Sequence, residues 1–428
     1  MGLRILASAD IHLGRKSSAV PRDLDVVSTK YTWERIVKTA IQNSADVLVI
    51  AGDVVDKDNS FYEAIGPLQS GFYKLQQAGI EVYLTAGNHD HDVLPQIAAN
   101  NKHENIHLLG QGGKWETQTY SKNGVQCQFV GWSFPGQFVS QDPLIYLEGS
   151  QLEPEIPTIG ILHGYLDDPE GKYAPLSLTN LTKQQLDAWI LGHIHTPQGF
   201  KQEAPYIAYM GAPHALTPSD PGVHGVILLE IQGKEQIRTR NIPLSPVRYA
   251  HLEIVVSEVQ NEADFREIVL SALTSSAQGM LRELEEVYYL VYDIYLQGEN
   301  SNVNAMDSWK QGLIDDYEQE LENGTMLCVR KIINEVKPAV SNLRELAQDP
   351  SPAGKLAETI LAIQNEESTP FLEDLLRDWQ LNLKRVNGAG TYRELNKEGR
   401  LSDASGARQY ILRECHRLLA ELLSQQES

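Results

Sequence analysis

Short apolar runs that alternate with helical patterns constrain the fold of this chain most. Val47–Ala51 and Ile159–Leu162 contain no polar side chain and are about one strand long. Between the first runs, Trp33, Ile36 and Val37 recur at the spacing of one helix face. This rhythm predicts an α/β fold with a parallel core, and later strands without long helices between them indicate a second, mixed or antiparallel sheet. The strands expected first are Leu3–Ser8, Val47–Ala51, Glu81–Thr85, Ile106–Leu109, Val125–Val130, Thr158–Leu162 and Ala188–Leu191.

Five polar clusters share one position, directly after an expected strand. Because ligands of α/β sheets bind beyond the carboxyl ends of the strands, we expect the clusters to converge. The clusters are Asp10-Ile11-His12, Gly52-Asp53-Val54-Val55-Asp56, Gly87-Asn88-His89-Asp90, His163-Gly164 and Gly192-His193-Ile194-His195.

The residue types in these clusters suit metal chemistry. Imidazole and carboxylate together bind Mn, Fe or Zn, and no cysteine occurs among them. Asp10-x-His12 can aim two side chains at one ion, and Asp53 after Gly52 can bridge two. Two ions about 3.5–4 Å apart stabilise the attacking and leaving oxygens of a phosphoryl displacement. Each cluster alone is a weak signal, and Gly-Asn-His-Asp alone can be a simple turn. All five in order predict a two-metal phosphoesterase.

The pattern D-x-H, G-D-x-x-D, G-N-H-D, H, G-H-x-H resembles that of the calcineurin-like metallophosphoesterases over about residues 1–245. The resemblance implies a four-layer αββα sandwich of two mostly mixed sheets. Within the family, Asp10-Ile11-His12-Leu13-Gly14 is similar to the opening of SbcD-like DNA repair exonucleases. This second likeness implies a phosphodiesterase that acts on DNA as an exonuclease or endonuclease.

The resemblance also implies a role for each site residue. One ion would take Asp10, His12, Asp53 and His195, and the other would take Asp53, Asn88, His163 and His193. The expected cofactor is a pair of divalent ions, Mn first, with Fe or Zn as alternatives. His89 would be the acid or a phosphate contact, and Asp90 would orient it.

Three further residues near these motifs keep open roles. Related nucleases have either histidine or aspartate at the position of Asp56. His91 is expected at the solvated surface. His214 follows a strand, and whether it approaches the site stays open. No substrate-binding residue is assigned.

A break near Pro243 and Pro246 suggests a domain boundary. We expect a catalytic domain over 1–245, a small α+β domain over 250–340 and a helical region over 341–428. A helix is expected at Ala305–Leu321. By the resemblance, the α+β domain would cap the catalytic one.

Charge and cysteine usage narrow the class of protein further. The net charge is −21, and the part after residue 250 holds 17 basic and 31 acidic side chains. This counts against a broad nucleic-acid surface, although metal ions or a local basic path can neutralise phosphate. The three cysteines are too few and too scattered for a disulfide framework. With no signal peptide or membrane span expected, we predict a cytoplasmic protein without membrane contact.

The leading interpretation is therefore a DNA phosphodiesterase in DNA repair, and two alternatives stay open. Hydrolysis of nucleotides or other small phosphoesters agrees better with the acidic composition. A non-catalytic scaffold is the third, which the intact ligand set disfavours. The likeness to SbcD-like nucleases implies two partners. One is DNA, and the other is an SbcC-like coiled-coil ATPase bound through residues 341–428. Whether copies of the chain associate stays open.

Overall fold

The computed structural model describes residues 2–426 except 57–60, 101–102, 123, 148–151, 235, 316, 340–342 and 389–403. The chain forms two compact units, and each takes several stretches of sequence. The first comprises Met1–His251, Met280–Tyr292 and Glu318–Arg330, and the second Leu252–Gly279, Asp293–Tyr317 and Lys331–Ser428. The chain thus returns twice to the first unit after residue 251. Domain boundaries near 245 and 340 stay a prediction.

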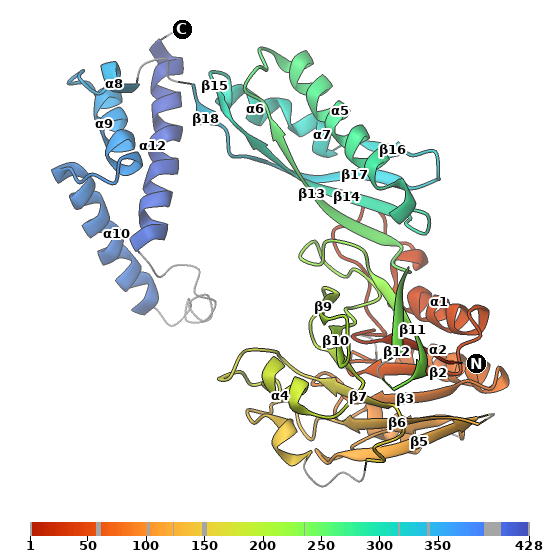
Figure 1. Cartoon of the computed structure of the whole chain (residues 1–428). Helices are drawn as coiled ribbons and strands as arrows, with labels where there is room; N and C mark the ends of the chain where they lie inside the picture. Colours follow the sequence, from red (N-terminus) through yellow and green to blue (C-terminus); the bar gives the residue numbers. More distant parts are fainter. Residues whose placement is uncertain are drawn as a thin grey trace. The chain divides into compact units, whose positions relative to one another are not determined.

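The first unit contains two six-stranded sheets among its described residues (Figure 1). In the first sheet, four parallel strands lie next to an antiparallel pair. Its order is β12 (Gln236–Pro243), β11 (Gly225–Gly233), β1 (Leu3–Ser8), β2 (Val47–Ala51), β3 (Glu81–Thr85) and β4 (Ile106–Leu108).

The second sheet also has a parallel centre, with one antiparallel strand at each edge. Its order is β5 (Glu116–Lys122), β6 (Val125–Trp132), β7 (Thr158–His163), β8 (Ala188–Gly192), β10 (Tyr206–Tyr209) and β9 (Gln198–Lys201). Both sheets are therefore mixed.

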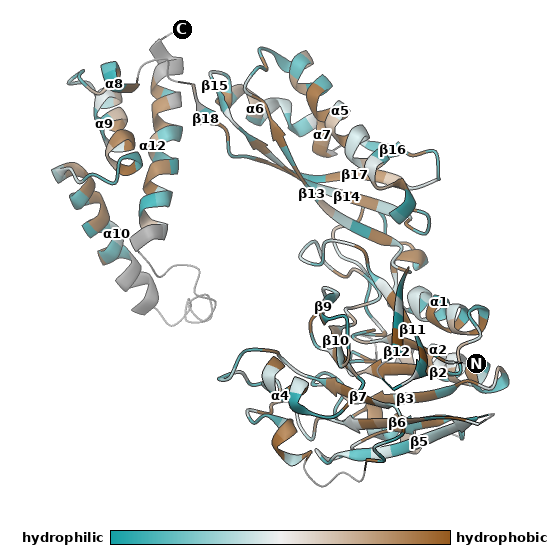
Figure 2. Ribbon diagram, in the orientation of Figure 1, coloured by the Kyte–Doolittle hydropathy of each residue, from teal (hydrophilic) through white to brown (hydrophobic). Residues whose placement is uncertain are grey.

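Three buried layers of side chains join these sheets and their helices. In β2, Val47 and Val49 face the core between the sheets, while Leu48 and Ile50 face the helices. Strands buried on both faces read as continuous apolar runs, which explains Val47–Ala51. In Figure 2, the brown of hydrophobic residues runs along β3 and β7. The helices and 3-10 turns of the first unit are η1 (Asp25–Val27), α1 (Thr29–Gln42), α2 (Phe61–Gln77), α3 (Leu94–Ala99), η2 (Pro143–Tyr146), α4 (Leu178–Lys183) and η3 (Leu281–Glu283).

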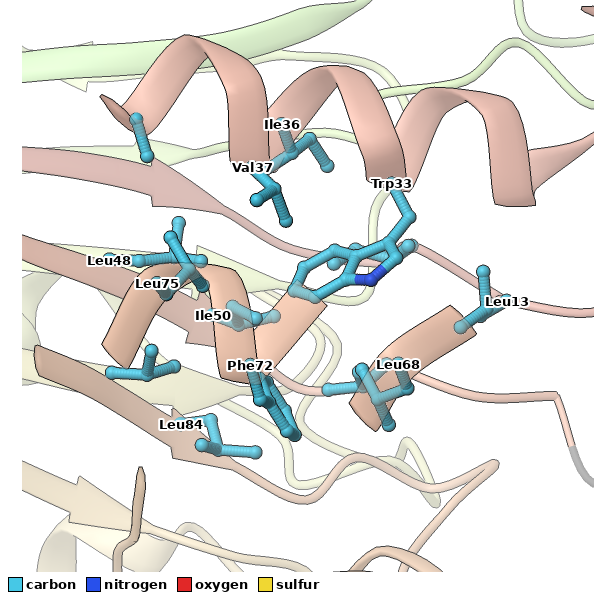
Figure 3. Packing of buried hydrophobic residues seen from close by; sticks show 14 of the residues in the cluster. Leu13, Trp33, Ile36, Val37, Leu48, Ile50, Leu68, Phe72, Leu75 and Leu84 are labelled. Atoms are coloured by element: carbon cyan, nitrogen blue, oxygen red, sulfur yellow. The ribbon is translucent and has the colours of Figure 1, made fainter. Parts of the chain in front are cut away.

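Helix α1 is capped at its first turn and packs against α2 through a buried tryptophan. It begins after Ser28, whose side chain accepts from the Tyr31 N–H and so caps the first turn. Trp33, which is fully buried, meets Phe72 of α2 edge-on at 5.8 Å between ring centroids (Figure 3). The α helices of the first sheet and the outer elements η2 and α4 of the second complete the layers. The predicted four-layer αββα sandwich is confirmed.

A third sheet follows, with the order β13 (Val247–Val255), β14 (Tyr289–Gln297), β17 (Met326–Asn334) and β16 (Glu318–Glu320). The helix expected over Ala305–Leu321 is wrong at its end, since α7 stops at Asp315. Glu318–Glu320 pairs instead with β17, so backbone pairing overrides local helical preference. The remaining elements here are α5 (Glu262–Gly279), β15 (Glu299–Asn300), α6 (Val303–Trp309), α7 (Gln311–Asp315) and β18 (Lys337–Pro338).

The C-terminal helices of the second unit pack around a small core of their own. Ile360, Leu372 and Leu419 lie at its centre. None of the helices in the described part of the chain is both long and apolar enough to cross a membrane. The helices are α8 (Leu343–Leu346), α9 (Pro352–Gln364), α10 (Pro370–Gly388) and α12 (Ala404–Gln426).

Candidate metal centre

The carboxyl ends of strands from both six-stranded sheets meet at one place. Asp10, Asp53 and Asn88 follow β1, β2 and β3 of the first sheet. His163 ends β7, and His193 follows β8 of the second. The loops after β1 and β2 are tied together, because the His12 N–H donates to the Asp53 carbonyl at 3.0 Å. The sandwich thus brings together side chains that are far apart in sequence.

Several of these residues adopt left-handed backbone conformations although they are not glycine. The φ angles are 49° at Asp10, 46° at His12, 48° at Asp53 and 106° at His193. Such conformations cost of the order of 1–3 kcal/mol each and persist where the surrounding structure imposes them, often at functional sites. Strained turns after the strands therefore aim these side chains toward one point.

Glycine is required at Gly52 and Gly192, where the loops pass close to other parts of the site. Gly52 has φ +79°, and a Cβ there would overlap the His163 ring. At Gly192 a Cβ would overlap the carbonyl oxygen of Ala51. The two glycines explain why the clusters begin with this residue.

The first group of ligand atoms surrounds two facing imidazoles. His12 Nε2 lies 3.1 Å from His195 Nε2. One ligand atom each of Asp10, His12 and His195 lies within 4.8 Å of the others. Asp53 Oδ2 is 3.8 Å from His12 Nε2. The structure thus brings together the four residues expected to hold one ion, and their role as ligands stays a prediction.

The second group adjoins the first through Asp53. Asp53 Oδ2 is 3.4 Å from His163 Nε2, which in turn lies 3.1 Å from Asn88 Oδ1. His193 Nδ1 is 3.3 Å from the same His163 nitrogen. Asp53 thus lies between His12 and His163.

Burial and charge shift the protonation of the cluster. Burial lowers the pKa of both His12 and His193 to about 3, so these rings are neutral and can donate a lone pair. Burial also raises the pKa of Asp10 to about 6. Burial would lower the pKa of His163, but the charge and hydrogen bond of Asp53 outweigh it and raise it to about 9. The same attraction outweighs burial in Asp53 and holds its pKa well below the usual range.

A pair of divalent cations fits this donor set. Asp10, His12, Asp53 and His163 are at most 2% exposed. Buried carboxylates need a compensating positive charge, and the facing His12 and His195 nitrogens need a cation or proton between them. Among the described residues, the buried Nδ1 of His12 has no hydrogen-bond partner. The His163 Nδ1 lies 3.1 Å from the Ala51 carbonyl, which leaves Nε2 as the ligand atom.

Asp90 has partners other than the expected His89 ring. Its Oδ2 accepts from the Val54 N–H at 2.7 Å, and its Oδ1 from the Gly87 N–H at 2.8 Å. No hydrogen bond joins it to the His89 ring within the described part of the chain. Burial, followed by the charge of Asp53, raises the pKa of Asp90 to about 7. Asp90 therefore links the loops after β2 and β3, and its role toward His89 stays a prediction.

His89 lies beside the ligands at a half-buried position. Its N–H donates to Asp53 Oδ1 at 2.9 Å, and its ring meets His12 edge-on at 5.1 Å. Asp56 is the carboxylate near it, since ligand atoms of His12, Asp56 and His89 lie within 4.8 Å of one another. Asp56 is also 3.6 Å from Arg15 Nε. Asp56, which is 2% exposed, is therefore a buried neighbour of both His12 and His89.

The other histidines separate into structural and peripheral ones. His214 is buried, with Nε2 2.7 Å from Ser17 Oγ and Nδ1 2.7 Å from Thr32 Oγ1. It therefore packs the fold, and burial lowers its pKa to about 3. His91 Nδ1 lies 3.2 Å from the Asn88 carbonyl, at the edge of the site.

Four residues at the site escaped sequence reasoning. Arg15 and Asp220 contact Asp56 and His195. Tyr165 and Tyr173 lie against His193, at 5.6 and 5.1 Å between ring centroids. None belongs to one of the five clusters, and Asp220 stands in Ser-Asp-Pro-Gly, which reads as an ordinary turn.

Comparison with known proteins agrees with this geometry. The family model for calcineurin-like phosphoesterases matches residues 3–197. The uncharacterized metallophosphoesterase YhaO of Bacillus subtilis is 27% identical over 237 residues, or 54% of this chain and 57% of that protein.

Two DNA double-strand break repair proteins are also similar. The DNA double-strand break repair protein Mre11 of Methanopyrus kandleri is 26% identical over 226 residues, covering 50% of this chain and 49% of that protein. The protein of the same name from Methanosarcina mazei is 23% identical over 320 residues, covering 73% and 48%. The chain thus spans about half the length of the relatives it matches.

Proposed function

Because residues 3–197 belong to the calcineurin-like phosphoesterase family, we propose that this metal-dependent phosphoesterase is a two-metal phosphodiesterase that cleaves DNA. The observation that carries the proposal is the convergence of Asp10, His12, Asp53, Asn88, His163, His193 and His195 at the strand ends. The likeness to two Mre11 proteins supports DNA as the substrate class.

Two bound divalent ions, with Mn²⁺ proposed first, would neutralise phosphate charge and lower the pKa of the attacking water. Asp53 would be a ligand at both metal positions. His89 would donate its proton to the leaving oxygen as the P–O bond breaks and the bond to the water oxygen forms. Its half-buried place beside His12 keeps the ring within reach of both the cluster and solvent.

Aromatic side chains beside His193 supply a surface for nucleobases. Tyr165 is 40% exposed, and Phe138, which is 56% exposed, lies 5.8 Å from Tyr173 between ring centroids. Bases stack on aromatic rings without sequence preference, which suits a nuclease. Stacking on these rings does not depend on basic side chains, so it agrees with the net charge of −21.

Tyr165→Ala should weaken DNA cleavage while leaving Mn²⁺ binding unchanged. Loss of the stacking of one base lowers the binding free energy of DNA by about 1–3 kcal/mol, which corresponds to about 5- to 150-fold in kcat/KM. The measurement is kcat/KM on single-stranded DNA, with calorimetry for Mn²⁺. Tyr165→Phe keeps the ring and should retain activity, and Tyr73→Ala, at an exposed position of α2, is the matched control. Equal rates for Tyr165→Ala and Tyr73→Ala would remove Tyr165 from the substrate surface.

The acidic composition favours a second candidate, hydrolysis of nucleotides or other small phosphoesters. One assay separates the candidates. Purified protein with Mn²⁺ is offered labelled single- and double-stranded DNA beside bis-p-nitrophenyl phosphate, with Asp53→Ala as the control for contaminating nuclease. Cleavage of DNA supports the proposal. Cleavage of the small ester alone supports the second candidate, and two bound Mn²⁺ ions without either activity would leave a scaffold.

We also propose that the helices after residue 341 help to bind a coiled-coil ATPase, which would supply a basic DNA surface. Ile411 and Cys415 of α12 are buried in the helices' own core. Leu381 and Leu418 remain 53% and 40% exposed, so they are free for a partner groove.

Leu381→Asp with Leu418→Asp should reduce co-purification of the full-length chain with such an ATPase from the same genome. A charge buried in an apolar interface costs several kcal/mol, so we expect about 10²-fold weaker binding or more. Tyr73→Asp, an exposed substitution in the first unit, is the control. Undiminished recovery of the double variant would exclude these positions from the interface.

A further inference from the structure

The loop that follows β10 returns to the metal centre. The Ala212 N–H donates to the His195 carbonyl at 2.9 Å, so the loop starts beside this histidine. Eight residues later along the chain, Asp220 Oδ1 lies 3.5 Å from His195 Nδ1. His195 thus presents Nε2 to His12 and Nδ1 to a carboxylate.

The carboxylate of Asp220 is held from its other side. Its Oδ2 accepts from the Thr217 N–H at 2.9 Å and from Thr217 Oγ1 at 3.0 Å. One oxygen is therefore anchored in the turn, and the other is left for His195. Asp220 is 7% exposed, so little water competes for it.

The backbone around Asp220 is fixed as well. The two ring nitrogens of His224 lie 2.8 Å from the Ala212 carbonyl and 3.0 Å from the Asp220 carbonyl. The Gly222 N–H donates to the Tyr249 carbonyl at 3.2 Å. His224 thereby links the start of the loop to its end.

We propose that Asp220 is a positioning residue, which keeps the proton of His195 on Nδ1 and turns Nε2 toward the ion expected at Asp10, His12 and Asp53. The inference rests on the proposed metal centre. Histidine ligands commonly donate their second N–H to a carboxylate or carbonyl, which fixes the tautomer and makes the ligand nitrogen more basic. His163 has the Ala51 carbonyl in this role, whereas His195 has a side chain that mutation can change.

The competing interpretation is that Asp220 only closes its own turn through Thr217. Two substitutions distinguish the interpretations. Asp220→Asn keeps a side-chain oxygen for the Thr217 N–H but removes the charge behind His195. Thr217→Val keeps the carboxylate and removes only the hydroxyl donor. If Asp220 positions His195, Asp220→Asn should lower the metal affinity and Thr217→Val should not. If Asp220 only closes its turn, both substitutions should lower the stability of the protein.

The test is calorimetric titration of full-length, metal-free protein with MnCl₂, with melting temperatures measured without metal. The wild type should bind two ions. Asp220→Asn and Asp220→Ala should weaken one of them by about 10- to 100-fold and leave the other unchanged. Asp220→Glu should recover part of the affinity. Asp23→Asn, which removes the same charge at a 74% exposed side chain, should behave as wild type.

Wild-type affinities at both sites in Asp220→Ala would overturn the inference. So would equal weakening of both sites with a lower metal-free melting temperature in Asp220→Asn, since that is the mark of a structural turn. A wild-type chain that binds no Mn²⁺ would overturn the metal centre itself and this inference with it.

Discussion

Asp53→Ala should abolish turnover of every phosphoester that the protein hydrolyses. Asp53 Oδ2 lies 3.8 Å from His12 Nε2 and 3.4 Å from His163 Nε2, so its loss affects both proposed ion positions. Metal ions supply several kcal/mol of transition-state stabilisation, and about 1.4 kcal/mol corresponds to tenfold in rate. We therefore expect kcat to fall by about 10³-fold or more, measured on bis-p-nitrophenyl phosphate with saturating Mn²⁺.

The control for Asp53 must separate metal loss from loop disorder. Asp53 Oδ1 also accepts from the His89 N–H at 2.9 Å, so alanine frees the loop after β3 as well. Asp53→Asn retains an acceptor for that N–H and removes the charge. Both variants should lose Mn²⁺ stoichiometry by calorimetry. Two equivalents of bound Mn²⁺ with wild-type activity in Asp53→Ala would refute the shared-ligand role.

His89→Asn should retain both ions but slow the reaction by about 10²- to 10⁴-fold, the usual range for loss of a general acid. The His89 ring is half-buried beside His12, and the backbone N–H of His89 donates to Asp53 Oδ1. A general acid matters most when the leaving oxygen is strongly basic. The loss should therefore be larger for DNA, whose leaving group is an alkoxide, than for a p-nitrophenyl ester.

The neighbouring His91 provides the matched control for His89. His91 lies on the same loop and contacts the Asn88 carbonyl at 3.2 Å. His91→Asn retains a side-chain amide that can donate to the Asn88 carbonyl, so we expect kcat to stay near the wild-type value. If His89→Asn instead loses one equivalent of Mn²⁺, His89 is a ligand and its assignment as the acid is wrong.

Local sequence was sufficient where the signal lies within a few neighbouring residues. Val47–Ala51 reads as a strand because both of its faces are buried, and β2 has these bounds. Asp10-x-His12 and Gly192-His193-x-His195 follow their strands directly, so their loops could be placed from the pattern. Convergence followed from a general rule about sheet edges. The roles of the seven proposed ligands stay predictions.

Tertiary structure decided what depends on partners distant in sequence. Asp90 was expected to orient its neighbour His89, but it accepts from Val54 and Gly87 because two loops from neighbouring strands enclose it. The end of the expected Ala305–Leu321 helix became β16, because β17 offers backbone partners that the local pattern does not reveal. Propensity is a weak prior once such pairing is available.

The sequence by itself determined an α/β fold with a second, mixed sheet and placed five polar clusters at strand ends, since the signals for periodicity and turns lie in neighbouring residues. The four-layer sandwich was implied by the family resemblance of the motifs. Only the tertiary structure decided which atoms meet. It joined His195 to Asp220, 25 positions away, and His12 to His195 across 183 positions. Such contacts arise from the way two sheets pack face to face. A carboxylate in a Ser-Asp-Pro-Gly turn gives no local sign that a histidine ligand lies beside it.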